Sequence, residues 1–350
     1  MPSLTEGTYT LFDNIKIFFT DSGAPPSSDD YTTVIVLHGS AFVGAGFEAL
    51  QSLAPTNNIR MVAMNRRGYR GSTPYTDAEI EGFKKGTKGS LNRVGLVIIS
   101  FLKTFIEREK IPRAASGGGV VVMGWSTGVT FTLSLFSDLD SLDSETRSLL
   151  EEYLKHLILY DPPYTSFGYQ PPPVFMSQAY QPWTDTQANL EERFNTFFYW
   201  ISSSFNHDYK AISTTSLDGY DLRKRTDECV VDSWSPEEVT KYYEPNGLYS
   251  ELIIRSNPAT ALQVRENADK ALFSRKLLPK LRITYLNAPR SPWLTVWPYL
   301  ETKRLYEECL ASNVDVRPVE FIVMDGVNHC VHQDQPELFM SFIMKSLSAA

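Results

Sequence analysis

Residues 124–128 read Gly-Trp-Ser-Thr-Gly, and this stretch constrains the fold more than any other part of the sequence. The apolar run 120–123 precedes it and the run 129–133 follows, which predicts a buried strand, a sharp turn and a helix. A turn this tight needs small residues, and glycine stands at both ends of it. A serine on such a turn exposes its hydroxyl at a sheet edge, so Ser126 is a candidate nucleophile. A purely structural Gly/Ser turn is the alternative, which the flanking strand and helix make the weaker interpretation.

Apolar runs of strand length recur along the chain and alternate with helical patterns. The strand-like runs are 32–39, 60–65, 120–124, 156–161, 281–286 and 319–324. Apolar residues at helical spacing cover 91–105, and further helices are expected near 298–311 and from about residue 335. This alternation predicts an α/β fold, with a mainly parallel sheet and helices on both faces.

Residues 164–278 lose the alternation and are rich in aromatic side chains. A structureless loop of this length is implausible, so the segment is expected to be a folded, mostly helical cap inserted before the last two strands. Short helices are expected at 188–204 and 236–243. The predicted organisation is therefore a core of residues 1–163 and 279–350 with a cap of residues 164–278. The aromatic residues could build the cap's own core, but some must face Ser126, and the predicted substrate contacts are Trp125, Trp183, Phe197, Phe198 and Trp200.

Composition restricts the partners of the chain. The 350 residues carry a net charge of −8, and no basic face is evident, which argues against nucleic acid. The cysteines Cys229, Cys309 and Cys330 show no metal-ligand spacing and do not suggest a disulfide framework. Neither a signal peptide nor a membrane span is expected, so the cytoplasm is the default compartment. A small-molecule substrate is the expected partner, and the oligomeric state stays open.

Four motifs, in this order, resemble the α/β-hydrolase family with an inserted cap. Residues 38–40 read His-Gly-Ser at the end of an early strand, like the family's oxyanion turn. Residues 65–72 are similar to the family's Asp-x-Arg-Gly-x-Gly-x-Ser stretch, although Asn65 replaces the aspartate and Arg70 precedes the second glycine. The turn at Ser126 is the third motif. The fourth is the stretch 326–337, which looks like the loop that carries the catalytic histidine.

The resemblance implies a triad with Ser126 as nucleophile and His329 as base, with His332 as the rival base. The commoner position of the acid follows the strand 281–286, where the chain has Ser291 but no carboxylate. Asp161, at the end of the preceding strand, is the expected acid, as in lipases and mycotoxin lactone hydrolases of the family.

Asp161 keeps the order serine, acid, histidine along the chain. A simple Asp-Pro turn is the alternative for Asp161, and Asp325 and Glu301 are the other carboxylates considered. Ser291 itself is expected to tolerate alanine. By the family pattern, the backbone N–H groups of Ser40 and Thr127 form the oxyanion hole.

The expected reaction is hydrolysis of a carboxylic ester or lactone of a small apolar molecule, which can include an aromatic ring. It needs neither a metal nor an organic cofactor. Two alternatives remain: the same triad used for amide, C–C bond or acyl-transfer chemistry, and a ligand-binding protein with low turnover. Epoxide and haloalkane hydrolases of the family have aspartate where this chain has Ser126, so these activities are not expected.

Overall fold

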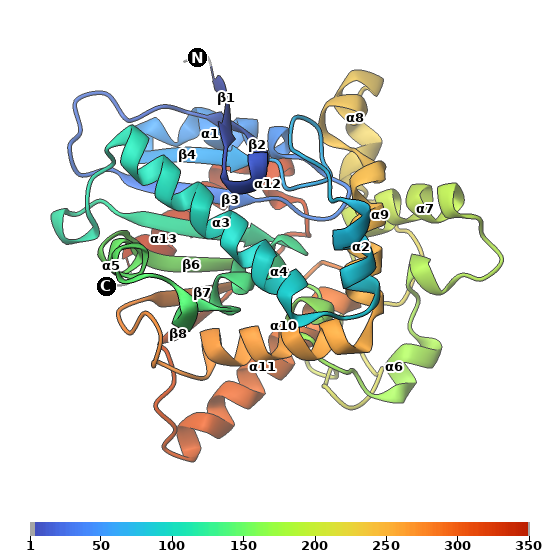
Figure 1. The fold of residues 1–350 in the computed structure, drawn as a ribbon. Helices are drawn as coiled ribbons and strands as arrows, with labels where there is room; N and C mark the ends of the chain where they lie inside the picture. Colours follow the sequence, from blue (N-terminus) through green and yellow to red (C-terminus); the bar gives the residue numbers. More distant parts are fainter. Residues whose placement is uncertain (1–3, 349–350) are drawn as a thin grey trace.

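The computed structural model describes residues 4–348, except for the side chains of residues 255 and 256. At its centre lies an eight-stranded sheet with the order β1-β2-β4-β3-β5-β6-β7-β8 (Figure 1). The first two strands pair antiparallel, β2 is antiparallel to β4, and all other neighbours are parallel. The strands are β1 (Thr5–Thr10), β2 (Lys16–Asp21), β3 (Thr32–Leu37), β4 (Ile59–Met64), β5 (Val120–Trp125), β6 (Leu154–Tyr160), β7 (Arg282–Asn287) and β8 (Val319–Val323). The predicted α/β class with a mainly parallel sheet is confirmed.

The six parallel strands are the six that the sequence predicted, within two residues at each end. Every residue of β3, β4 and β5 is buried, because helices cover both faces of the sheet. The two antiparallel strands at the edge, β1 and β2, were not predicted. Only Tyr9 is buried in β1, and in β2 buried residues alternate with exposed or half-buried ones, so neither strand is a continuous apolar run.

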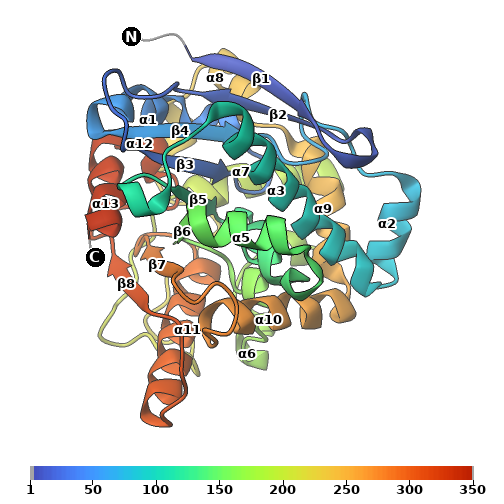
Figure 2. The same ribbon diagram turned by 60° about the vertical axis from the view of Figure 1, so that its left-hand side comes forward.

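Helices form a layer on each face of the sheet (Figures 1 and 2). One layer holds α3 (Lys88–Glu109), α4 (Gly128–Leu133) and α5 (Ser144–Tyr153), and the other holds α1 (Glu48–Leu53) and α13 (Pro336–Ser348). The helix predicted near 298–311 is α11 (Trp293–Ala311), which begins earlier and contains Pro298. Proline is common at the first position of a helix, but here it lies inside one.

The long insertion between β6 and β7 is helical. It contains α6 (Pro173–Gln178), α7 (Leu190–Ser202), α8 (Pro236–Tyr242), α9 (Leu248–Ser256) and α10 (Pro258–Leu272), and the helices predicted at 188–204 and 236–243 correspond to α7 and α8. Helices α6 to α9 gather on the right of Figure 1. The last helix, α10, packs instead against α3 and α4 of the sheet layer. The cap boundary at residue 278 stays a prediction.

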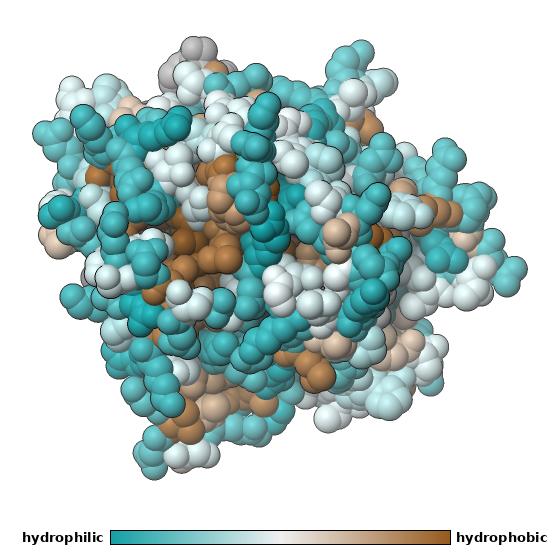
Figure 3. Space-filling view, viewed as in Figure 1, coloured by the Kyte–Doolittle hydropathy of each residue, from teal (hydrophilic) through white to brown (hydrophobic). Residues whose placement is uncertain are grey.

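Helix α3 is long and apolar enough to cross a membrane by length and composition, although the sequence reading found no such run. A core helix passes the same test, and 56% of its most apolar window is buried inside the protein. It packs against α4 and α5, and Figure 3 shows a mainly hydrophilic face with hydrophobic residues gathered where α3 passes α5. We therefore describe α3 as a helix of the sheet layer.

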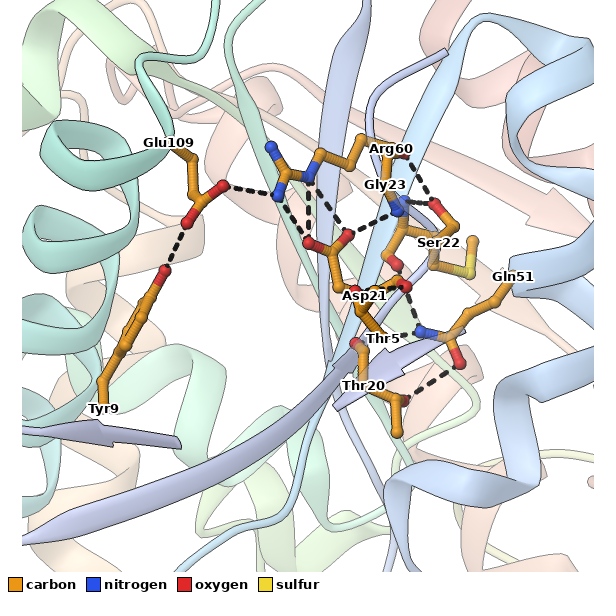
Figure 4. Close-up of polar contacts among 10 residues, drawn as sticks. Thr5, Tyr9, Thr20, Asp21, Ser22, Gly23, Gln51, Arg60 and Glu109 are labelled. Carbon is orange, nitrogen blue, oxygen red and sulfur yellow. Dashed lines mark hydrogen bonds and ion pairs between the residues drawn. The ribbon is translucent and has the colours of Figure 1, made fainter. Parts of the chain in front are cut away.

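A buried ionic network joins the edge strands to the rest of the sheet (Figure 4). Arg60 of β4 forms ion pairs with Asp21 at 2.5 Å and with Glu109 at 2.8 Å, and the Tyr9 hydroxyl donates to Glu109 at 2.8 Å. These four side chains come from β4, β2, α3 and β1. Arg60 lies near the start of its strand, so the network stabilises the sheet edge opposite to the one that carries Ser126.

Two glycines of α3 allow a matched test of this packing. A Cβ atom at Gly95 would lie 2.1 Å from the carbonyl oxygen of Ser134, whereas a Cβ atom at Gly89 would meet nothing within 4 Å. We expect Gly95→Ala to lower the free energy of unfolding by about 1–3 kcal/mol. Gly89→Ala should leave it unchanged or raise it by up to about 1 kcal/mol, because alanine favours the helix. Urea unfolding of both variants is the measurement, and equal stabilities would contradict the close approach of α3 to residue 134.

Candidate active site

Ser126 lies on the turn between β5 and α4, and its backbone has the left-handed value φ = 55°. This conformation is strained for serine and typical of a nucleophile turn. At the neighbouring positions 124 and 128 there is no room for a side chain larger than that of glycine. A Cβ atom at Gly128 would lie 2.1 Å from the Leu37 carbonyl oxygen, and one at Gly124 would lie 2.7 Å from the Val129 nitrogen.

Asp161 and His329 are hydrogen-bonded to each other. The Nδ1 atom of His329 lies 2.6 Å from the Oδ2 atom of Asp161, and the two residues are 1% and 0% exposed. A carboxylate can only accept, so Nδ1 carries the proton in this contact. Asp161 follows β6 and has φ = 46°, a second left-handed residue at the same edge of the sheet. The structure thus brings together the acid and the base that the sequence predicted.

Three further donors surround the Asp161 carboxylate. Its Oδ1 atom accepts hydrogen bonds from the Ala288 nitrogen at 3.0 Å and from Asn287 Nδ2 at 3.2 Å. Its Oδ2 atom also accepts from the Ser291 hydroxyl at 2.6 Å. The expectation that alanine is harmless at 291 does not fit this contact. Sequence reasoning missed the role of Ser291, and the available signal was a small polar residue at the commoner acid position.

The rival residues lie elsewhere. Asp325 is exposed, and Glu301 forms an ion pair with Arg304 at 2.7 Å. His332 is buried, stacks on Phe47 and contacts the Tyr160 hydroxyl through Nδ1 at 3.1 Å. Burial, with a smaller contribution from the nearby His329, holds the pKa of His332 well below its usual value.

Two side chains of β5 and β6 hold the backbone of His329 in place. Its carbonyl oxygen accepts hydrogen bonds from Trp125 Nε1 at 2.9 Å and from the Tyr160 hydroxyl at 2.7 Å. The other ring nitrogen, Nε2, has no hydrogen-bond partner within the described residues 4–348. The imidazole is therefore held by its main chain and by Asp161, with Nε2 available to take a proton.

Ser40 and Thr127 line the same cavity as Ser126, and their role as oxyanion donors stays a prediction. The turn that carries Ser40 is held by two buried side chains, His38 and Arg66. The Arg66 backbone N–H donates to His38 Nε2 at 3.1 Å, and its guanidinium donates to the carbonyls of His38 and Gly39 at 2.9 and 3.0 Å. Burial first, and then the charge of Arg66, lower the pKa of His38 well below its usual value, so this histidine stays neutral.

Glu251, on α9 of the insertion, is a buried carboxylate that the sequence analysis did not single out. It forms an ion pair with Arg66 at 2.5 Å and accepts hydrogen bonds from the hydroxyls of Tyr69 at 2.7 Å and Ser40 at 2.5 Å. The hydroxyls of Ser40 and Thr127 are themselves 2.7 Å apart. Burial alone would lower the pKa of Arg66, but the charge of Glu251, the nearby tyrosines and the hydrogen bond to Glu251 together outweigh it, so the pKa is raised. No sequence pattern marks Glu251, because its partners are up to 211 residues away.

A cavity of about 250 Å³ opens over Ser126, with walls from the core and from the insertion. Of the predicted substrate contacts, Trp183 and Phe197 line it. Trp125, Phe198 and Trp200 do not, and for these three the prediction is corrected. Each is a packing residue: Trp125 lies under His329, Phe198 packs on Tyr243, and Trp200 packs on Tyr180. An aromatic pattern alone does not distinguish a cavity wall from a helix core.

Metal binding was also considered. Within the part of the chain that the structure describes, no group of three or more His, Cys, Asp or Glu side chains is placed to hold a metal ion.

Comparison with known proteins agrees with this geometry. Residues 34–342 match the model of the alpha/beta hydrolase family. An esterase from Exiguobacterium antarcticum has a similar structure at 14% identity, with 99% of this chain and 100% of that chain covered and a TM-score of 0.50.

Two other similar structures carry different activities. One is epoxide hydrolase A from Mycobacterium thermoresistibile, at 13% identity, 99% coverage of both chains and a TM-score of 0.55. The other is a haloalkane dehalogenase from Agrobacterium tumefaciens C58, at 12% identity, 99% and 97% coverage and a TM-score of 0.53. No curated protein matches the sequence significantly. The chain belongs to the alpha/beta hydrolase family, and this membership supports a hydrolase whose substrate the comparisons do not specify.

The contact between Asp161 and His329 predicts the effect of removing the charge. Asp161→Asn keeps the shape of the side chain but cannot stabilise the imidazolium or select its tautomer, so kcat should fall by about a thousandfold or more. Ser291→Ala removes only one donor to the carboxylate, and we expect a smaller loss, on the order of tenfold. Steady-state kinetics of both variants is the measurement. Near wild-type activity of Asp161→Asn would show that another group orients His329.

The buried pair of Glu251 and Arg66 predicts a stability effect. Glu251→Gln leaves the Arg66 charge without its partner, and the free energy of unfolding should fall by roughly 3–5 kcal/mol. The matched control is Glu244→Gln, which breaks the ion pair of Glu244 with the 43% exposed Arg70 side chain and should cost about 0–1 kcal/mol. Thermal and urea unfolding compare the two variants, and equal losses would contradict the importance of burial.

Proposed function

We propose that this protein is a serine hydrolase that cleaves a carboxylic ester or lactone of a small apolar molecule through an acyl-enzyme. The observation that carries the proposal is the 2.6 Å contact of His329 with Asp161 beside a cavity that contains Ser126 on a strained turn. A nucleophile, a base and an orienting acid in this chain order fit acyl transfer.

The proposed reaction has two steps. The Ser126 hydroxyl attacks the carbonyl carbon while His329 Nε2 takes its proton, and the N–H groups of Ser40 and Thr127 stabilise the oxyanion. His329 then gives the proton to the leaving alkoxide, which departs as an alcohol. Water, deprotonated by the same imidazole, attacks the acyl-enzyme, and the imidazolium returns this proton to the Ser126 oxygen as the acid is released. Asp161 keeps its charge and holds His329 in the required tautomer throughout.

The cavity supports a small apolar substrate. Its volume of about 250 Å³ lies below the roughly 300–1,000 Å³ typical of pockets for drug-sized ligands. Trp183 and Phe197 give it aromatic walls on which a flat group can stack. In this proposal residues 164–278 act as a cap over Ser126, and the cytoplasm stays the proposed compartment.

Two alternatives use the same site differently. Amide, C–C bond or acyl-transfer chemistry would also begin with attack by Ser126, and product analysis on esters, lactones, amides and diketones distinguishes these reactions. A ligand-binding protein with low turnover would not need Ser126 and His329 together. The direct contact between Asp161 and His329 favours an enzyme over this alternative.

Labelling with a fluorophosphonate tests the nucleophile without knowledge of the substrate. The wild type should be labelled covalently at residue 126, and Ser126→Ala should show neither labelling nor ester turnover, a loss of several orders of magnitude. Ser134→Ala, at a buried serine of the same helical region, is the matched control and should still be labelled. If Ser126→Ala keeps more than about a tenth of wild-type turnover, the acyl-enzyme mechanism is wrong.

A further inference from the structure

The cavity wall contains two polar groups that the proposed mechanism does not use, on Gln181 and Thr165. Both residues line the cavity over Ser126. Gln181 is 6% exposed, and its Nε2 atom is buried without a hydrogen-bond partner in the described chain. The hydroxyl of Thr165 is likewise buried and unpartnered there.

Gln181 lies next to the segment that carries Thr165. The Tyr164 hydroxyl donates to Gln181 Oε1 at 3.3 Å, which fixes one side of the amide and leaves the Nε2 donor unused. A buried donor without a partner costs free energy that a hydrogen bond would recover. Because both residues line the cavity, a ligand in it is one source of that hydrogen bond for both groups, once the side chains turn toward it.

The charge of the site restricts that ligand atom. The residues described as lining the cavity carry no charged side chain. The buried cation Arg66 is already paired with Glu251 at 2.5 Å. A substrate carboxylate would therefore be buried without a counter-ion, at a high desolvation cost. An uncharged oxygen, such as that of a ketone, ester or ether, accepts from an amide N–H and a hydroxyl without this cost.

We propose that Gln181 and Thr165 form a polar subsite that binds an uncharged oxygen acceptor of the substrate, separate from the carbonyl that Ser126 attacks. The inference rests on the proposed function and specifies its substrate class. The molecule is a largely apolar ester or lactone with a second neutral oxygen function. Gln181 and Thr165 determine specificity, and neither takes part in the bond-breaking steps.

Matched esters test the proposal. The probes are para-nitrophenyl hexanoate and a series of keto analogues in which a carbonyl replaces each acyl methylene in turn. The wild type should prefer at least one keto ester over the parent ester by about tenfold or more in kcat/KM. An analogue that ends in a carboxylate should be worse than the parent.

Gln181→Met and Thr165→Val remove the donors with little change in volume, and each should reduce the keto preference by about threefold to tenfold. Thr184→Val is the control. Thr184 also lines the cavity, but its hydroxyl already donates to the main-chain carbonyl oxygen of Gln181 at 2.9 Å. It should keep the preference. Thr165→Val should also leave the melting temperature unchanged or raise it, since it removes an unpaired polar group, whereas a structural hydroxyl would lower it.

Binding to Ser126→Ala separates this inference from the proposed function. Calorimetric titration of that variant with the preferred keto ester and the parent ester measures the preference without chemistry. A ratio of the two Kd values near one, or a preference that survives in both Gln181→Met and Thr165→Val, overturns the subsite. A preserved Kd ratio without turnover by the wild type would support the subsite and contradict the hydrolase.

Discussion

The burial of the Asp161 charge is the constraint on which the site depends. A carboxylate with no solvent exposure is stable in this position only because four donors surround it. Asn287 at the end of β7 and two residues of the segment after it supply three of the donors, and the loop after β8 supplies the fourth. Parallel pairing places the ends of these strands at one edge, next to the end of β6. The same contacts that satisfy the charge therefore fix the position of the imidazole relative to the turn of Ser126.

The contact of Glu251 with the oxyanion turn extends this argument to the insertion. Helix α9 contributes a carboxylate that neutralises Arg66 and accepts a hydrogen bond from Ser40. The Arg66 guanidinium in turn binds the carbonyls of His38 and Gly39, the two residues directly before Ser40. The insertion is thus part of the structure that shapes the candidate oxyanion hole as well as one wall of the cavity. A change in α9 is transmitted to the core through ionic contacts that low-dielectric surroundings strengthen.

Much of the fold could be predicted because its signals are local. The six parallel strands are continuous apolar runs, and the turn at Ser126 needs two glycines that no larger residue could replace. Ser126 and Asp161 directly follow a strand and His329 lies in the loop after one, so the family resemblance could locate them one by one. Glu251 and Ser291 depend on partners far away in the sequence, and no local pattern records such contacts. Trp200 and Phe198 were predicted to contact the substrate, but they pack against other aromatic residues instead. The sequence could not show this, because a helix core and a cavity wall favour the same aromatic residues.

The hydrogen bond between Ser291 and Asp161 has an evolutionary consequence. The oxygen atoms of these two side chains are 2.6 Å apart, although one residue follows β7 and the other follows β6. A negative charge at either place would occupy nearly the same volume next to the imidazole. A lineage could therefore transfer its acid from one strand to the other through an intermediate sequence with a carboxylate at each position, sharing a proton. Such a transfer would involve one substitution at each of these two positions.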